Sequence, residues 1–353
     1  MAKKQAQTSD NRGAVAFGSG LAATLLLLAA FQGSVPALML AYLSPLPLMI
    51  ATIGFGHITG LGAVLAAFIT LVALLVAASP QDLSPAAFLN AAFNGGVFVL
   101  CEGLPSWWLA RLASLSPSVP ILPFAAFAPA KSDKDGSRLS LVIVTTAIFA
   151  FLIVAGVLAT LVLEHENFAA LIDKIATNIT PVMKQEAGAD LLRRNEIDAI
   201  ARFMAKALPA VAAGVIFVVF LIDLWLAGRI VQISQRLQVP WPNIAREFRV
   251  PRLLALVFFA AVGLIFLGGP AGLLASLAAS VLGAAFALQG LAVIHVVTQG
   301  LRLRNNLLFV VYLVMVPLLP WSLAPFTLLG LIEAGFSLRD RKEAAAVPRN
   351  ELN

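Results

Sequence analysis

The sequence predicts an all-α, polytopic transmembrane helical bundle with about eight full spans and a proline-broken C-terminal helical hairpin. Composition is the first observation, because 60% of the 353 residues are hydrophobic and only 12% are charged, whereas soluble domains carry about 25% charged residues. The second is contiguity, because Asp, Glu, Lys and Arg are absent from residues 13–81, 139–163, 253–301 and 305–332. A membrane-spanning helix needs roughly 20 apolar residues, so each of these stretches can hold at least one span.

Apolar runs, and the polar or proline-containing turns between them, place the individual spans. The eight expected full spans cover residues 15–31, 37–53, 58–78, 86–109, 139–163 and 207–228, followed by two within 253–301 that divide at Gly268-Gly269-Pro270. Residues 112–130 are apolar but contain four prolines, and proline removes a backbone donor from a helix. We therefore expect this segment on the cytoplasmic surface rather than across the membrane.

The last apolar run, residues 305–332, can form one span or two short helices. Pro317, Pro320 and Pro325 interrupt it near its middle, and a proline inside a helix breaks the hydrogen-bond ladder. One straight span would also carry the basic residues that follow it to the outer side, against the positive-inside rule. Both considerations favour a hairpin of two short helices.

The distribution of Lys and Arg predicts the orientation in the bilayer. A net charge of +6 is interpreted as an orientation signal beside apolar runs, with no nucleic-acid partner. We expect a cytoplasmic N-terminal tail (1–12), a single transmembrane domain (13–333) and a cytoplasmic C-terminal tail (334–353). Within the domain, the loop 229–252 has five arginines and one glutamate and is expected in the cytoplasm. The amphipathic segment 164–206 is expected outside, as two short helices on an inner (cytoplasmic) membrane.

Glu102 is the first candidate binding residue, because ionisable groups inside a span are costly and tend to face protein or water. Asn90 and Asn94 precede it by twelve and eight residues, which places the three near one helical face. A carboxylate beside two amides can bind a cation, a proton or an amine-bearing solute. The alternative is that Glu102 lies near the cytoplasmic end of its span and pairs with Arg111.

A second polar group lies in the eighth span. Gln289, His295 and Gln299 are candidate solute-binding or ion-binding residues, and His295 and Gln299 share a face because they are four residues apart. The alternative for the histidine is a hydrogen bond between helices. Asp223 and Arg229 of the sixth span form a candidate intramembrane ion pair.

A broken helix is expected at residues 44–47 (SPLP). Unwound backbone at membrane depth occurs only inside protein or beside a cavity, and broken helices of this kind often line solute sites. A simple kink is the alternative.

The sequence lacks the patterns of soluble enzymes and metal sites. Its three histidines (His57, His165 and His295) have no metal-ligand spacing, and no HExxH, CxxC or phosphate-binding loop occurs. The single cysteine, Cys101, cannot form an internal disulfide bond. We therefore expect no catalytic residue, no metal and no cofactor.

Three short motifs resemble the YybS-like bacterial membrane family, which is catalogued as a domain of unknown function. They are residues 248–253 (FRVPRL), 286–294 (FALQGLAVI) and 330–339 (GLIEAGFSLR). The family pattern often has aspartate where this chain has Glu333 and Ser337. The overall run of spans also fits, so the resemblance can extend over most of the chain.

That family is distantly similar to the substrate-binding S subunits of energy-coupling-factor vitamin transporters. The resemblance implies a small-solute-binding or transport subunit that lacks its own ATPase, with a transmembrane coupling subunit and ATPases as partners beside the lipid bilayer. The main alternative is a membrane scaffold or assembly factor with no small-molecule ligand. A membrane-embedded enzyme is a third reading, which would need clustered acids and histidines that the sequence does not show.

Overall fold

The structure is a computed structural model, and it describes residues 2–78, 81, 84–115, 134–164, 168–186, 194–237, 240–319 and 321–346. The elements in these ranges are helices, without a strand. The prediction for the proline-rich segment falls mostly on residues 116–133, and those residues and His165 lie outside the described ones.

The chain divides into two compact units. Unit 1 comprises Met1–Ala125, Asp133–Thr146 and Val218–Pro242, and unit 2 comprises Ala126–Ser132, Ala147–Phe217 and Asn243–Asn353. Two long helices, α7 (Lys134–Glu164) and α9 (Arg194–Ile233), contribute residues to both units.

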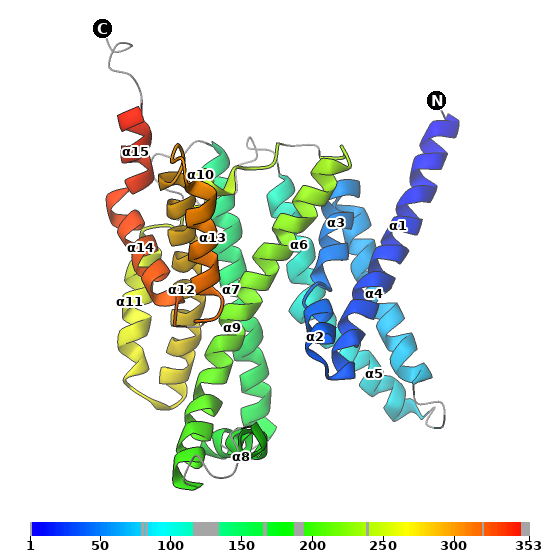
Figure 1. The fold of residues 1–353 in the computed structure, drawn as a ribbon. Coiled ribbons are helices and arrows are strands. Elements are labelled where there is room, and N and C mark those ends of the chain that lie inside the picture. Colours follow the sequence, from blue (N-terminus) through cyan, green and yellow to red (C-terminus); the bar gives the residue numbers. More distant parts are fainter. Residues whose placement is uncertain are drawn as a thin grey trace. The chain divides into compact units, whose positions relative to one another are not determined.

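Unit 1 is built around a tight pair of helices near the start of the chain. Its elements in chain order are α1 (Ala2–Ala29), η1 (Ala30–Gln32), α2 (Val35–Ala41), α3 (Pro45–Phe55), α4 (His57–Ala77), α5 (Pro85–Phe98), η2 (Val99–Gly103) and α6 (Leu104–Ser114). Helix α1 lies along α4 (Figure 1), and the Thr24 hydroxyl donates to the Ala67 carbonyl over 3.1 Å. A Cβ on Gly20 would lie 2.6 Å from the Ala63 carbonyl oxygen, so this glycine is what lets the two backbones meet.

Two departures from regular helix shape unit 1. Residues 42–44 form turns between α2 and α3, as the SPLP segment predicts, and Pro45 opens α3. The second departure is η2, a single π-helical turn in which the Leu104 N–H donates to the Val99 carbonyl five residues earlier. Pro105 follows directly and has no N–H to offer the Cys101 carbonyl, which accounts for the interrupted α-ladder at this point.

Unit 2 is centred on α12, the helix with the most buried residues. Besides its parts of α7 and α9, unit 2 contains α8 (Phe168–Glu186), α10 (Ile244–Glu247), α11 (Leu253–Ile265), α12 (Gly269–Val297), α13 (Arg304–Met315), α14 (Leu323–Phe336) and α15 (Leu338–Ala346). Helices α12 and α14 touch backbone to backbone, because a Cβ on Gly290 would lie 2.1 Å from the Phe326 carbonyl oxygen and one on Gly330 1.9 Å from that of Phe286.

Seven of the described helices are long and apolar enough to cross a membrane. They are Arg12–Gln32, Val35–Phe55, His57–Ala77, Pro85–Ser114, Arg138–Leu163, Glu196–Ile233 and Gly269–Val297. Eight full spans were expected, and the one that is not found is the span at α11. This helix has 13 residues and would extend only about 20 Å at 1.5 Å per residue. The break in the last apolar run is confirmed, because α13 and α14 are separate short helices and the chain reverses direction between them (Figure 1).

In the described part of segment 164–206, which leaves out 165–167 and 187–193, one separate helix is found where two were expected. Helix α8 is strongly amphipathic and packs its apolar face on the first turns of α9 through Ile172, Ala176, Ala201 and Ala205. The second expected amphipathic helix is continuous with the following span, because α9 runs through Pro209 without ending. Small alanines at the contact let α8 lie close to α9, which gives the apolar face of α8 a protein partner.

Candidate functional site

Glu102 faces the break between α2 and α3 within unit 1. It lies in the π turn η2 and is partly buried. The hydroxyl of Ser44, itself buried at the break, donates a hydrogen bond to the Glu102 Oε1 atom. The two irregular points of unit 1 are therefore joined by one polar contact.

Asp223, on the segment of α9 that belongs to unit 1, is the second acid of this cluster. Its side chain is 1% exposed, and its Oδ2 atom has no hydrogen-bond partner. The Glu102 carboxylate lies near enough for the two charges to act on each other. Three segments of unit 1 thus contribute Ser44, Glu102 and Asp223, which we together call the carboxylate site.

Neither carboxylate of this site forms an ion pair with any side chain that the structure describes. Arg111, the partner considered from the sequence, lies instead over the rings of Trp107 and Trp108, at 5.5 and 5.8 Å from their centroids. Burying one unpaired acid at the centre of a span costs about 2.5–3.5 kcal/mol on insertion scales. Two such groups in one compact unit therefore call for a chemical explanation.

The two amides predicted to share a face with Glu102 do not join the site. Asn90 and Asn94 are exposed on α5, and the Asn94 Nδ2 atom donates to the Asn90 Oδ1 and carbonyl oxygens, each over 2.8 Å. The π turn Val99–Gly103, which contains Glu102, begins after Asn94 and changes the helical phase. The spacing of a regular α-helix, which predicted that the three side chains share a face, therefore does not hold across this π turn.

The predicted ion pair between Asp223 and Arg229 is not among the ion pairs of the described residues. The Arg229 guanidinium donates to the Gln232 side chain over 2.7 Å and is exposed. Six residues on an α-helix correspond to a rotation of about 600°, which leaves the two side chains on different faces.

The three polar residues predicted in the eighth span separate into different environments. Gln289 is 1% exposed, accepts from the Val250 N–H and donates to the Gly330 carbonyl over 2.8 Å. The His295 Nε2 atom lies 2.8 Å from the Tyr312 hydroxyl. Gln299 lies beyond Val297, where α12 ends, so the helical spacing from His295 does not apply to it.

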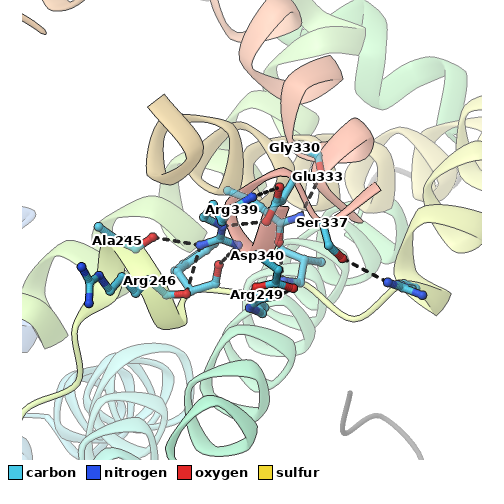
Figure 2. A network of polar contacts seen from close by, with 12 residues as sticks. Ala245, Arg246, Arg249, Gly330, Glu333, Ser337, Arg339 and Asp340 are labelled. Atoms are coloured by element: carbon cyan, nitrogen blue, oxygen red, sulfur yellow. Dashed lines mark hydrogen bonds and ion pairs between the residues drawn. The ribbon is translucent and has the colours of Figure 1, made fainter. Parts of the chain in front are cut away.

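Unit 2 contains a second polar assembly that the sequence analysis did not anticipate, and Figure 2 shows it. The Arg339 Nε atom lies 2.7 Å from the Glu333 Oε1 atom, and both side chains are 2% exposed. The same guanidinium donates to the carbonyls of Ala245, Arg246 and Phe248 over 2.9, 3.3 and 2.9 Å. Arg339 therefore satisfies the carbonyls around the short helix α10 while its own charge is paired.

An outer layer of contacts extends this assembly, which we call the arginine clamp. Arg249 binds the Asp340 carboxylate with both Nη atoms, one of them over 3.0 Å. Arg252 donates to the Ser337 hydroxyl over 3.2 Å. The hydrogen bond from Arg249 lowers the pKa of the Asp340 carboxyl below its ordinary value.

The clamp brings together the three motifs on which the family resemblance rests. Residues 248–253 supply the loop, 286–294 supply Gln289 and the close contact of Gly290, and 330–339 supply Glu333 and Arg339. The pairing of Glu333 with Arg339 went unrecognised because six residues are not neighbours on a helix. A turn at Ser337, with φ of 50°, separates α14 from α15 and lets the pair meet.

The fold and these sites define the class of the protein: it is a polytopic, helical integral membrane protein, whose apolar spans contact the lipid bilayer. The chain belongs to the family described as predicted membrane protein DUF2232, whose model matches residues 122–333. This match confirms the resemblance and includes Asp223, whereas Ser44 and Glu102 precede it. No curated protein and no solved structure matches the chain.

Proposed function

We propose that this protein is a small-solute-binding or transport subunit of the inner (cytoplasmic) membrane, with both termini in the cytoplasm and no ATPase of its own. The observation that carries the proposal is the carboxylate site, where the Ser44 hydroxyl donates to Glu102 and Asp223 is buried with an unpartnered Oδ2 atom, among helices long enough to span a membrane. Intramembrane ionisable groups are functional candidates because their burial is costly.

The depth of the two acids supports this proposal. Glu102 precedes Arg111 by nine residues and Asp223 precedes Arg229 by six, which corresponds to about 13 Å and about 9 Å along their helices. If both arginines lie at the cytoplasmic headgroups, both carboxylates lie in the cytoplasmic half of a hydrocarbon core of about 30 Å. A solute bound there would have left bulk water.

The local backbone at the site also supports binding. The turns at 42–44 and the π turn at Val99–Gly103 each depart from the regular α-helical hydrogen-bond pattern. Irregular backbone at membrane depth is tolerated inside protein or beside a water-filled cavity, and π turns are frequent at functional sites. The proposal is of a binding protein and not of an enzyme.

The partners that fit this proposal are a transmembrane coupling subunit and ATPases, as the likeness to energy-coupling-factor S subunits implies. The chain has no phosphate-binding loop, so energy for transport has to come from a gradient or from such subunits.

A scaffold or assembly factor is the second candidate, and the arginine clamp favours it. The polar side chains at its centre are paired with each other or with backbone carbonyls, and they are far less accessible than a ligand site requires. A scaffold that binds its partners only through its surface is expected to have all of its buried polar groups paired in this way. The two carboxyl groups of the carboxylate site would then be protonated and would bind no solute.

Native mass spectrometry of the protein in mild detergent tests the proposal. We expect the wild type to retain a small molecule at fixed stoichiometry and the Glu102→Gln and Asp223→Asn variants to lose it. Asp173→Asn is the matched control, because Asp173 is an exposed acid of unit 2 that pairs with Arg202 over 3.5 Å. Lipid adducts alone, equal in all four proteins, would favour the scaffold.

A further inference from the structure

We propose that unit 2 binds an anionic phospholipid of the cytoplasmic leaflet, with the headgroup on exposed arginines and the acyl chains along the hairpin of α13 and α14. This inference goes beyond the proposed function and takes from it only the orientation in the membrane. It rests on two observations. Positive charge is in excess where three segments of unit 2 meet, and the apolar helices that begin there are too short to cross a membrane.

Contacts of the C-terminal segment bring three basic segments to one end of unit 2. The Arg252 guanidinium donates to the Ser337 hydroxyl, just after α14, over 3.2 Å. The Lys342 Nζ atom donates to the Gln299 carbonyl, just after α12, over 3.0 Å. The loop before α11, the turn between α12 and α13 and the start of α15 are therefore neighbours. Each carries an exposed arginine, and we call these three residues the basic end: Arg252, Arg302 and Arg341.

The acids of the same segments do not neutralise this charge. Residues 243–252, 299–304 and 333–342 contain eight basic residues and three acids. Two of the acids pair with arginines of the arginine clamp, and the third, Glu247, accepts from the backbone N–H of Asn243 over 2.8 Å. An excess of five positive charges remains, so this end of unit 2 is complementary to an anion.

The hairpin of α13 and α14 reaches only partway across the membrane. Helix α13 has 12 residues and α14 has 14, which correspond to about 18 and 21 Å, whereas the hydrocarbon core is about 30 Å thick. The Thr327 hydroxyl, in the second turn of α14, donates to the Gly283 carbonyl over 3.1 Å. Gly283 is the middle residue of α12. The hairpin therefore stops near the middle of this span and lies mainly in one leaflet.

The turn of the hairpin is suited to contact with hydrocarbon. The Ser322 hydroxyl donates to the Met315 carbonyl over 2.7 Å and so satisfies a carbonyl at the end of α13, and Pro317 has no N–H to leave unpaired. Of the twelve residues of α13, all of which the structure describes, none is buried. Apolar side chains at the turn are exposed as well: Val316, Leu318, Leu319 and Trp321.

A phospholipid of the leaflet that holds the hairpin fits both observations. Arg302 comes two residues before α13, and Arg252 directly precedes α11. A headgroup on these arginines would therefore have its acyl chains beside exposed apolar helices. Basic groups at the cytoplasmic ends of membrane helices bind anionic headgroups. A soluble acidic protein would be complementary to the arginines but not to the exposed apolar side chains that follow them.

Native mass spectrometry of the full-length protein tests the inference, with phosphatidylglycerol and phosphatidylcholine of identical acyl chains titrated into mild detergent. We expect the wild type to retain phosphatidylglycerol with an apparent affinity at least about tenfold higher than that for phosphatidylcholine. Arg302→Gln/Arg341→Gln should remove most of this preference, because each arginine near an anionic surface contributes a factor of about five. Both side chains are exposed and lie outside the arginine clamp.

Arg229→Gln/Arg236→Gln is the matched control. It removes two exposed arginines from unit 1 and leaves the basic end unchanged, so the preference for phosphatidylglycerol should persist. Gel filtration in the same detergent shows whether each variant is folded. Arg252 is left in place in both variants because its contact with Ser337 supports the fold.

Three outcomes would overturn the inference. Equal retention of the two lipids by the wild type would mean that the arginines do not select the headgroup. Equal loss of the preference in both double variants would assign it to the net charge of the protein. Displacement of phosphatidylglycerol by inorganic phosphate, but not by acetate at the same ionic strength, would make a soluble anion the ligand. The carboxylate site lies in unit 1, so these outcomes leave the proposed function to its own test.

Discussion

At the scale of single residues, the two polar assemblies handle buried charge in opposite ways. In the arginine clamp, Glu333 and three backbone carbonyls accept four hydrogen bonds from the Arg339 guanidinium, as expected of a charge that the fold itself requires. In the carboxylate site, Asp223 is equally buried but has an oxygen without a partner. A buried charged group whose polar atoms are paired within the protein indicates a structural residue, whereas a buried acid with an unpartnered oxygen indicates a candidate for binding.

The first prediction concerns Arg339. Arg339→Ala leaves the buried Glu333 carboxylate without its cation, with only the backbone N–H of residue 339 as a donor, and removes the guanidinium from three carbonyls, so we expect a loss of about 3–5 kcal/mol in the free energy of unfolding. Thermal unfolding in detergent, followed by intrinsic tryptophan fluorescence, measures the shift. Arg341→Ala, two residues away and exposed, should change little. An equal effect of the two substitutions would contradict the clamp.

The second prediction concerns Asp340 and pH. Because Arg249 lowers the folded-state pKa of Asp340, this pair stabilises the protein at pH values above about 3.9, the ordinary pKa of aspartate. The contribution is lost as the pH falls through the lowered value. We expect the unfolding midpoint of the wild type to exceed that of Asp340→Asn at neutral pH and to meet it in strong acid. Parallel pH profiles would rule out a contribution from the pair.

At the scale of elements, backbone contact between α12 and α14 organises unit 2. The third prediction is that Gly330→Ala destabilises the protein by about 1–3 kcal/mol, the range for overpacking, because its Cβ would lie 1.9 Å from the Phe286 carbonyl oxygen. Gly335→Ala, on the same helix with open space around its Cβ, is the matched control. The same unfolding measurement applies, and equal midpoints for the two variants would show that the helices can separate freely.

The elements also show how far the sequence determines the site. The turn at Gly56 and the break at Ser44 follow from glycine and proline chemistry, and both are present. The π turn at Glu102 was not predicted, because its five-residue hydrogen bond depends on how the chain accommodates Pro105 within the packed unit. Asp223 was predicted to pair with Arg229, which donates instead to Gln232.

At the scale of the whole molecule, the two ends of the last apolar run return to the same end of unit 2. The Lys342 Nζ atom donates to the carbonyls of Val296 and Gln299 over 3.1 and 3.0 Å, so α15 lies at the C-terminal end of α12. This contact agrees with the hairpin expected from the three prolines and the positive-inside rule.

The fourth prediction is therefore a topology. In a Cys101→Ala background, single cysteines at positions 302 and 341 should react with a membrane-impermeant thiol reagent from the same side of the membrane. A cysteine at position 177 of α8 should react from the opposite side. Labelling of 302 and 341 from different sides would reject the hairpin and leave a single span.

The long separation in sequence between the parts of the arginine clamp has a consequence for biosynthesis. The carbonyls of α10 and the guanidinium that satisfies them are 94 residues apart in the chain. During translation, the α10 segment emerges long before position 339 has been made, and four helices are inserted in between. Throughout that interval its carbonyls depend on water or on chaperones. Unit 2 thus reaches its final form late in synthesis, and a ribosome-bound chain that stops before position 339 should remain sensitive to proteases around residue 245.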